Sequence, residues 1–165
     1  MTLKEKFPAE DWEAVLQGPM MAGFAVTAAD PSGLIGTVQE SAAIAATLRS
    51  AKEGAEGALA KEVADGYAGS EGRTSAMGGV KALIKGKKPL EASEAAVKRL
   101  GEIAGIVDRV APEHAAEFRA FLMAVATKTA EAAKEGGFLG FGGVPISEAE
   151  HKTLDDLRGQ LGQMA

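Results

Sequence analysis

The chain lacks cysteine, and this absence excludes several kinds of chemistry at once. Without thiols there is no disulfide framework, no iron–sulfur cluster, no zinc–thiolate site and no cysteine nucleophile. Histidine is scarce as well, with two residues in 165. Because His114 and His151 both lie among charged residues in turns that we expect to be exposed, they do not suggest a serine–histidine–acid triad. We therefore expect no cofactor, and a binding protein rather than an enzyme.

Basic charge and long apolar runs are lacking too. The formal charge is −5, which disfavours nonspecific nucleic-acid binding because that needs a basic face. The first residues, "MTLKEKFPAEDWEA", contain no apolar core of a signal peptide. The longest apolar run, about residues 14–29, is interrupted by Gln17, Gly18 and Pro19 and is too short to span a bilayer. We expect a cytoplasmic protein with no nucleic-acid partner and no membrane partner.

Small residues are abundant instead. The chain has 33 alanines and 21 glycines, whereas aromatic residues make up only 5%. This composition suits helices that pack with their backbones close together, and the lack of β-branched runs argues against a β-sandwich. A chain of 165 residues should bury roughly 70% of the surface that its unfolded form exposes. We predict one all-α domain over residues 1–165.

Nearly every segment has the apolar spacing of a helix. Pro8 and the carboxylates after it suit the start of a first helix, and Pro19 should kink or restart that helix. Ser147 and Glu150 form a capping box for the last helix. Glycines at 54 and 57 and the segment 70–72 should be breaks. The predicted helices cover about residues 8–29, 34–67 with a break, 74–85, 97–110, 112–134 and 148–161, an irregular bundle of six or seven helices.

Two short segments are alike and lie 104 positions apart. Residues 28–36 read "AADPSGLIG" and residues 132–140 read "AAKEGGFLG". Each follows an alanine-rich helix and precedes another helix, as expected of a corner where a helix ends at glycine and apolar residues fold back on it. The likeness predicts an internal pseudo-twofold repeat of helical hairpins. A chance match between alanine-rich segments is the alternative.

This layout resembles a known family. Two alanine-rich helices, each followed by a glycine corner, with the acidic-capped segment "VPISEAEHKTLDDLRGQL" after the second, are similar to TerB-type tellurite-resistance proteins. The "GGFLGFGG" corner also resembles that of small uncharacterised bacterial helical proteins. The likeness covers about residues 20–50 and 118–162, and it implies an all-helical fold and a stress-related role. TerB-type corners carry acidic residues linked to cation binding, but here Pro31 follows Asp30, and Lys134 and Glu135 replace an aspartate. The resemblance therefore implies the fold and not an ion site.

The glycine-rich stretch 136–146 holds the candidate binding residues Phe138, Leu139 and Phe141. Exposed aromatic side chains are unfavourable unless they contact something. They could plug the open end of the bundle, or contact a partner protein, a second copy or a small apolar ligand. Insertion of loop 137–143 into a membrane, as in a peripheral membrane protein, is a further alternative, although no basic residues surround the loop.

Glu148 and His151 suggest a metal-binding alternative. Residues three apart share a helix face, so both could bind one metal, as in ferritin-like proteins. Such a site needs a second pair of this spacing, yet residue 111, three before His114, is alanine. The plainer interpretation is a solvated first turn in which Glu148 and Glu150 interact favourably with the helix dipole.

Lys81, Lys85, Lys87 and Lys88 form the one basic cluster in the sequence. At a helix C-terminus they complement the dipole, and contact with an anionic partner is the alternative. All these patterns favour a non-catalytic, cytoplasmic, helical interaction protein. Its partner would be another protein, a second copy of itself or a small apolar ligand.

Overall fold

The fold is built from helices that pack around one central helix. A computed structural model describes residues 1–30, 37–135 and 146–162, and within these ranges it contains seven α-helices and no strand. The predicted all-α bundle of six or seven helices is confirmed. The helices are α1 Ala9–Ala29, α2 Thr37–Lys52, α3 Ala58–Gly66, α4 Ser70–Ile84, α5 Pro89–Val110, α6 Ala115–Glu135 and α7 Glu148–Gln160, with short 3₁₀ turns η1 Lys4–Lys6 and η2 Pro112–His114.

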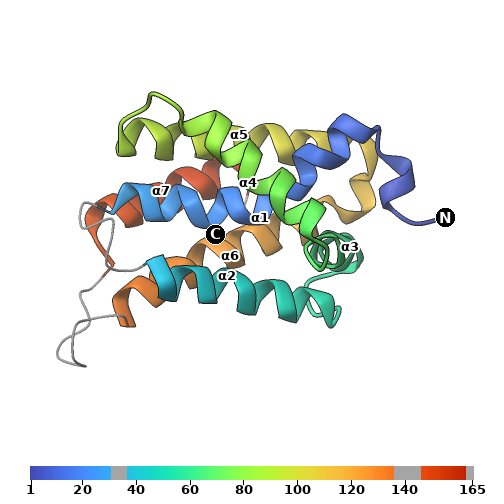
Figure 1. The fold of residues 1–165 in the computed structure, drawn as a ribbon, viewed down its shortest axis with the longest axis horizontal. Helices are drawn as coiled ribbons and strands as arrows, with labels where there is room; N and C mark the ends of the chain where they lie inside the picture. Colours follow the sequence, from blue (N-terminus) through green and yellow to red (C-terminus); the bar gives the residue numbers. More distant parts are fainter. Residues whose placement is uncertain (31–36, 136–145, 163–165) are drawn as a thin grey trace.

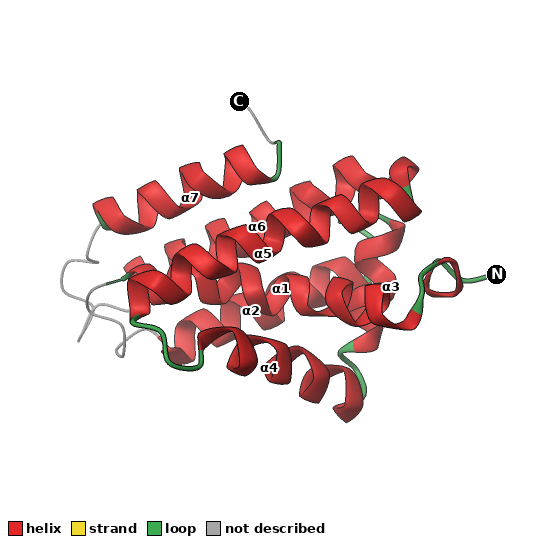
Figure 2. Cartoon of the chain, turned by 90° about the horizontal axis from the view of Figure 1, so that it is seen from above, coloured by secondary structure: helices red, strands yellow, loops and turns green. Residues whose placement is uncertain are grey.

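Helix α1 is the central element (Figures 1 and 2), and it packs against each of the other six helices. Its sequence explains this position, because it is apolar around most of its circumference rather than on one stripe, which is typical of a buried helix. Twelve of its 21 residues are buried: Trp12, Ala14, Val15, Leu16, Gly18, Pro19, Met21, Ala22, Gly23, Ala25, Val26 and Ala29.

Pro19 lies inside α1, and the helix continues through it rather than restarting. A proline has no N–H to donate, so it interrupts the hydrogen-bond ladder of a helix. Next to this proline, the Tyr67 hydroxyl ties α1 to the end of α3, because it donates to the carbonyl oxygen of Leu16 at 2.6 Å. Burial raises the pKa of Tyr67 well above its usual range, and the hydrogen bond from Met20 offsets part of that rise.

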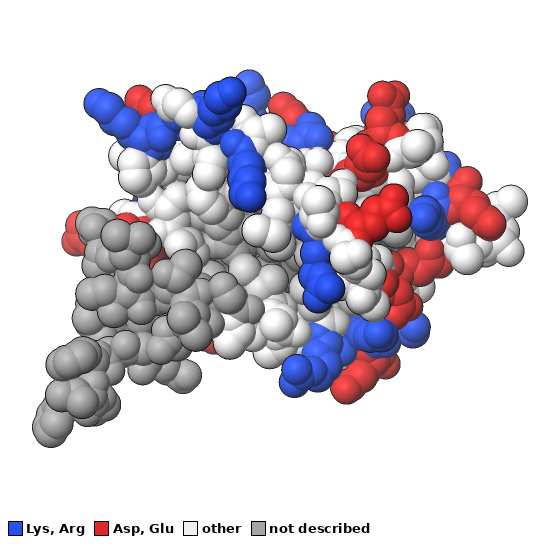
Figure 3. Space-filling model, in the orientation of Figure 1, with Lys and Arg blue, Asp and Glu red and all other residues white. Residues whose placement is uncertain are grey.

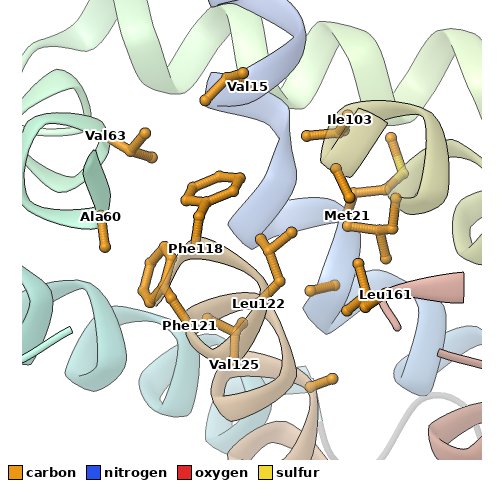
Figure 4. Close-up of a cluster of buried hydrophobic side chains, with 14 of the residues drawn as sticks. Val15, Met21, Ala60, Val63, Ile103, Phe118, Phe121, Leu122, Val125 and Leu161 are labelled. Carbon is orange, nitrogen blue, oxygen red and sulfur yellow. The ribbon is translucent and has the colours of Figure 1, made fainter. Parts of the chain in front are cut away.

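Small residues let the other helices approach α1 closely. A Cβ atom at Gly18 would lie 3.0 Å from Cδ2 of Leu122, and one at Gly66 would lie 2.7 Å from Cδ2 of Leu16. The core between these helices is formed by large apolar side chains of α1, α5 and α6 (Figure 4). Phe118 and Phe121 of α6 lie there with their ring centroids 6.0 Å apart. The alanine and glycine content therefore serves close helix packing, as predicted.

The helices that flank the two glycine corners form two antiparallel pairs. α1 and α6 end at the same end of the molecule, and α2 and α7 start there and run back (Figure 1). α2 packs against α6 as well as α1, and α7 packs against α1 as well as α6. This arrangement is what a pseudo-twofold repeat requires. Residues 31–36 and 136–145, which hold most of both corners, lie outside the described ranges, so the repeat stays a prediction.

Candidate functional site

Phe138, Leu139 and Phe141, the binding residues predicted from the sequence, lie outside the described ranges. Their proposed contacts therefore stay predictions. Glu148 and His151, the candidate metal ligands, are both exposed on the first turn of α7. Within the ranges that the structure describes, no three or more acidic or histidine side chains are grouped so that they could hold a metal ion.

Glu150, next to His151, differs from the solvated residue that we expected. Its exposed fraction is 4%, because its carboxylate folds back over the helix start and accepts the N–H of Ser147 at 2.7 Å. The Ser147 hydroxyl in turn accepts the N–H of Glu150 at 3.1 Å. The capping box is thus confirmed, whereas a solvent-facing Glu150 is wrong. The role of Glu150 is to begin α7.

A groove is lined by elements that lie at the end of the molecule opposite the C-terminal ends of α1 and α6 (Figure 1). Its walls come from the N-terminal segment, the start of α1, helix α3 and the start of α4, and its volume is about 1220 Å³. These segments belong to two stretches that are far apart in the sequence, residues 2–16 and 58–75, and the fold alone brings these together. We call this surface the acidic groove.

The floor of the acidic groove is apolar. Phe7 and Trp12 lie with their ring centroids 5.8 Å apart, and each is only 6% exposed. Leu16 extends the floor toward α3, where Gly66 leaves room for it. On the far side, Gly72 of α4 faces the backbone carbonyl of Gly66, so the start of α4 lies directly against the end of α3. Both glycines line the groove, so part of its wall is bare backbone.

Glu62 of α3 holds the N-terminal wall in place. Its two carboxylate oxygens accept the backbone N–H groups of Leu3 and Lys4 at 2.7 and 2.8 Å. Hydrogen bonds to an ionised acceptor are stronger than neutral ones. The same segment also forms an ion pair, between Lys6 and Glu113 of η2 at 2.7 Å. The hydrogen bond from Lys6 holds the pKa of the Glu113 carboxyl below its usual value. The wall is therefore fixed at both sides.

The rim of the acidic groove is strongly acidic. Five carboxylates and two lysines line it, a formal charge of −3: Glu5, Glu13, Glu62, Asp65, Glu71, Lys4 and Lys61. Figure 3 shows acidic side chains gathered at this end of the molecule. Asp65 pairs with Lys61 at 3.1 Å, and Glu5 accepts the N–H of Thr2. In contrast, Glu13 and Glu71 are exposed and have no hydrogen-bond or ion-pair partner in the described part of the chain.

None of the groove residues was among the sites predicted from the sequence. The available signal was weak: carboxylates cluster in residues 5–13 and 62–71, and the single tryptophan lies beside the first cluster. Nothing in the sequence shows that the two clusters meet. Only the packing of α3 and the N-terminal segment against α1 does so.

Known proteins provide no relative from which a function could be transferred. No family model matches the chain, and no curated protein and no solved structure matches it. The resemblance to TerB-type proteins stays a prediction, and so does the stress-related role that it implies.

Proposed function

We propose that this protein is a non-catalytic interaction module whose acidic groove binds a basic, partly apolar segment of a partner protein. One observation carries the proposal: a groove of about 1220 Å³ combines a buried aromatic floor with a rim of formal charge −3. Lysine or arginine side chains of the partner would pair with Glu13 and Glu71, and its apolar side chains would cover the floor.

The dimensions and lining of the groove favour a polypeptide over a small apolar ligand. Pockets for drug-sized molecules are usually about 300–1,000 Å³ and mostly apolar. This groove is larger, and seven of the residues that line it are charged. A small apolar ligand would remove carboxylates such as Glu13 and Glu71 from water without pairing them, which is unfavourable. A basic segment would pair them, and charge complementarity would also speed its association.

A cytoplasmic location belongs to the same proposal. Within the described ranges no helix has both the length and the apolar character needed to cross a bilayer. Self-association through Phe138, Leu139 and Phe141 is a separate proposal, which does not use the residues that line the groove.

Fluorescence anisotropy with a labelled amphipathic peptide of lysine and leucine tests the proposal. The double substitution Glu13→Gln and Glu71→Gln should weaken binding about tenfold, since each rim ion pair contributes up to about 1 kcal/mol and 1.4 kcal/mol is a factor of ten. Added salt should weaken binding of the unaltered protein as well.

A matched control neutralises two exposed carboxylates away from the groove, Glu131 and Glu148. The substitutions Glu131→Gln and Glu148→Gln should leave the peptide's affinity within about twofold, because screened charges at a distance contribute little. A peptide of the same length and pattern with glutamate in place of lysine should not bind. Equal losses in both double variants, or binding of the glutamate peptide, would contradict the proposal.

A further inference from the structure

Helix α4 and the turn that follows it are only thinly covered by the rest of the described bundle. Only Ala76 and Val80 of its 15 residues are buried. Apart from Met1, the exposed large hydrophobic side chains of the described ranges are Met77 of α4 and Leu90 at the start of α5, which are 46% and 57% exposed. Both therefore lie on this one hairpin.

Positive charge is concentrated on the same hairpin. Residues 72–90 contain five cationic side chains and no carboxylate, although the whole chain carries a charge of −5. All five are exposed: Arg73, Lys81, Lys85, Lys87 and Lys88. Figure 3 shows lysine and arginine side chains gathered at the α4–α5 turn. We call these five residues together with Met77 and Leu90 the basic strip.

The cations of the basic strip have no acidic partners, unlike many of the cations elsewhere in the described residues. Eight lysines and arginines elsewhere form ion pairs: Lys6, Lys52, Lys61, Arg99, Arg109, Arg119, Lys152 and Arg158. None of the five in the strip does so within the described residues. Their charge is therefore available to an anionic surface outside the molecule.

The turn itself is well defined. Gly86 adopts a positive φ of 76°, which ends α4, and the Lys87 ammonium donates to the carbonyl of Leu83 at 2.6 Å. The Lys88 N–H donates to the Glu91 carboxylate at 3.0 Å and so begins α5. Leu90, two residues after Lys88, is therefore exposed to solvent at the start of α5, close in sequence to the lysines of the turn. The helix-dipole role predicted for the cluster thus holds for Lys87, and the other lysines remain free for a second role.

We propose that the basic strip docks on the surface of an anionic lipid bilayer, with Leu90 and Met77 entering the headgroup region. Lysines that surround exposed apolar side chains are typical of interfacial binding, and each lysine near an anionic bilayer strengthens binding about fivefold. Nucleic acid fits less well, because the strip has no aromatic side chain for base stacking and only one arginine. This inference does not depend on the acidic groove.

Sedimentation with vesicles tests the proposal. The protein should bind vesicles that contain phosphatidylserine and should not bind vesicles of phosphatidylcholine alone. Substituting Lys81→Gln and Lys85→Gln should weaken binding about 25-fold, from about fivefold for each lysine. Leu90→Ser should weaken it about tenfold, because the leucine no longer leaves water on docking.

The control substitutions Lys98→Gln and Lys128→Gln remove the same charge from exposed positions on α5 and α6. They should change vesicle binding less than about twofold. Equal binding to both vesicle types, or an equal loss in the control, would overturn the proposal. So would binding to poly-L-glutamate that is as tight as binding to vesicles and insensitive to Leu90→Ser, because the strip would then be a general cationic surface.

Discussion

At the level of single residues, the Tyr67 hydroxyl fastens the end of α3 to α1. The side chain is buried, and its hydroxyl donates to the carbonyl oxygen of Leu16 at 2.6 Å. A buried polar group without a partner is costly, so this hydrogen bond is needed where the tyrosine packs. The sequence predicted a kink or restart at Pro19, but it does not show that Tyr67, 48 positions later, packs beside that turn of α1.

Replacing Tyr67 with phenylalanine removes the hydroxyl and leaves the ring. We expect Tyr67→Phe to lower the free energy of unfolding by about 1–3 kcal/mol at neutral pH, because the Leu16 carbonyl loses the hydroxyl that donates to it in the core. Urea unfolding followed by circular dichroism measures this change. An unchanged midpoint would show that this hydrogen bond does not stabilise the fold.

The same substitution changes the pH dependence of stability. The folded-state pKa of Tyr67 lies above its ordinary value of 10.0, so the folded protein keeps a proton that the unfolded chain releases. The contribution of this group to stability is therefore complete below pH 10 and is lost as the pH rises further. The unaltered protein should lose stability more steeply above that pH than Tyr67→Phe, in urea midpoints measured at several alkaline pH values.

At the level of elements, apolar spacing and capping residues predicted most of the helices. The break around Gly54 and Gly57 and the start of α7 after Ser147 are confirmed. The boundaries of α4 and α5 were harder to predict. We predicted a break at residues 70–72, but these residues begin α4. Gly72 has no side chain, so the start of α4 can lie directly against Gly66 at the end of α3. The helix predicted over residues 97–110 starts earlier than expected, because Pro89 is the first residue of α5.

Two glycines of α4 provide a matched test of this packing. A Cβ at Gly72 would collide with the carbonyl oxygen of Gly66, whereas a Cβ at Gly78 would meet no atom within 4 Å. We expect Gly72→Ala to destabilise the fold by about 1–3 kcal/mol, because backbone cannot move aside cheaply. Gly78→Ala should stabilise it by up to about 1 kcal/mol, through helix propensity alone. Thermal unfolding of both variants would show opposite shifts, and equal shifts would contradict the described contact.

At the level of the whole molecule, charge is distributed unevenly. The acidic groove lies beside the N-terminal segment and α3, and the basic strip follows α4 toward the opposite end (Figure 3). The lysine cluster lies within one short stretch of the sequence, so the sequence alone predicts it. The groove was not predicted, because residues 2–16 and residues 58–75 form its walls, and Glu62 joins these two stretches only after folding. A surface formed by neighbouring residues of one segment can be predicted from this sequence, whereas a surface formed by distant segments cannot.

The central claim, that the acidic groove binds basic polypeptide, is tested most directly by nuclear magnetic resonance of the ¹⁵N-labelled protein during titration with the lysine–leucine peptide. Shifts should concentrate at the Trp12 indole N–H and at backbone amides of residues 2–9 and 61–75, the segments that line the groove. Shifts confined to residues 146–162, or no shifts at peptide concentrations that saturate the anisotropy signal, would contradict it.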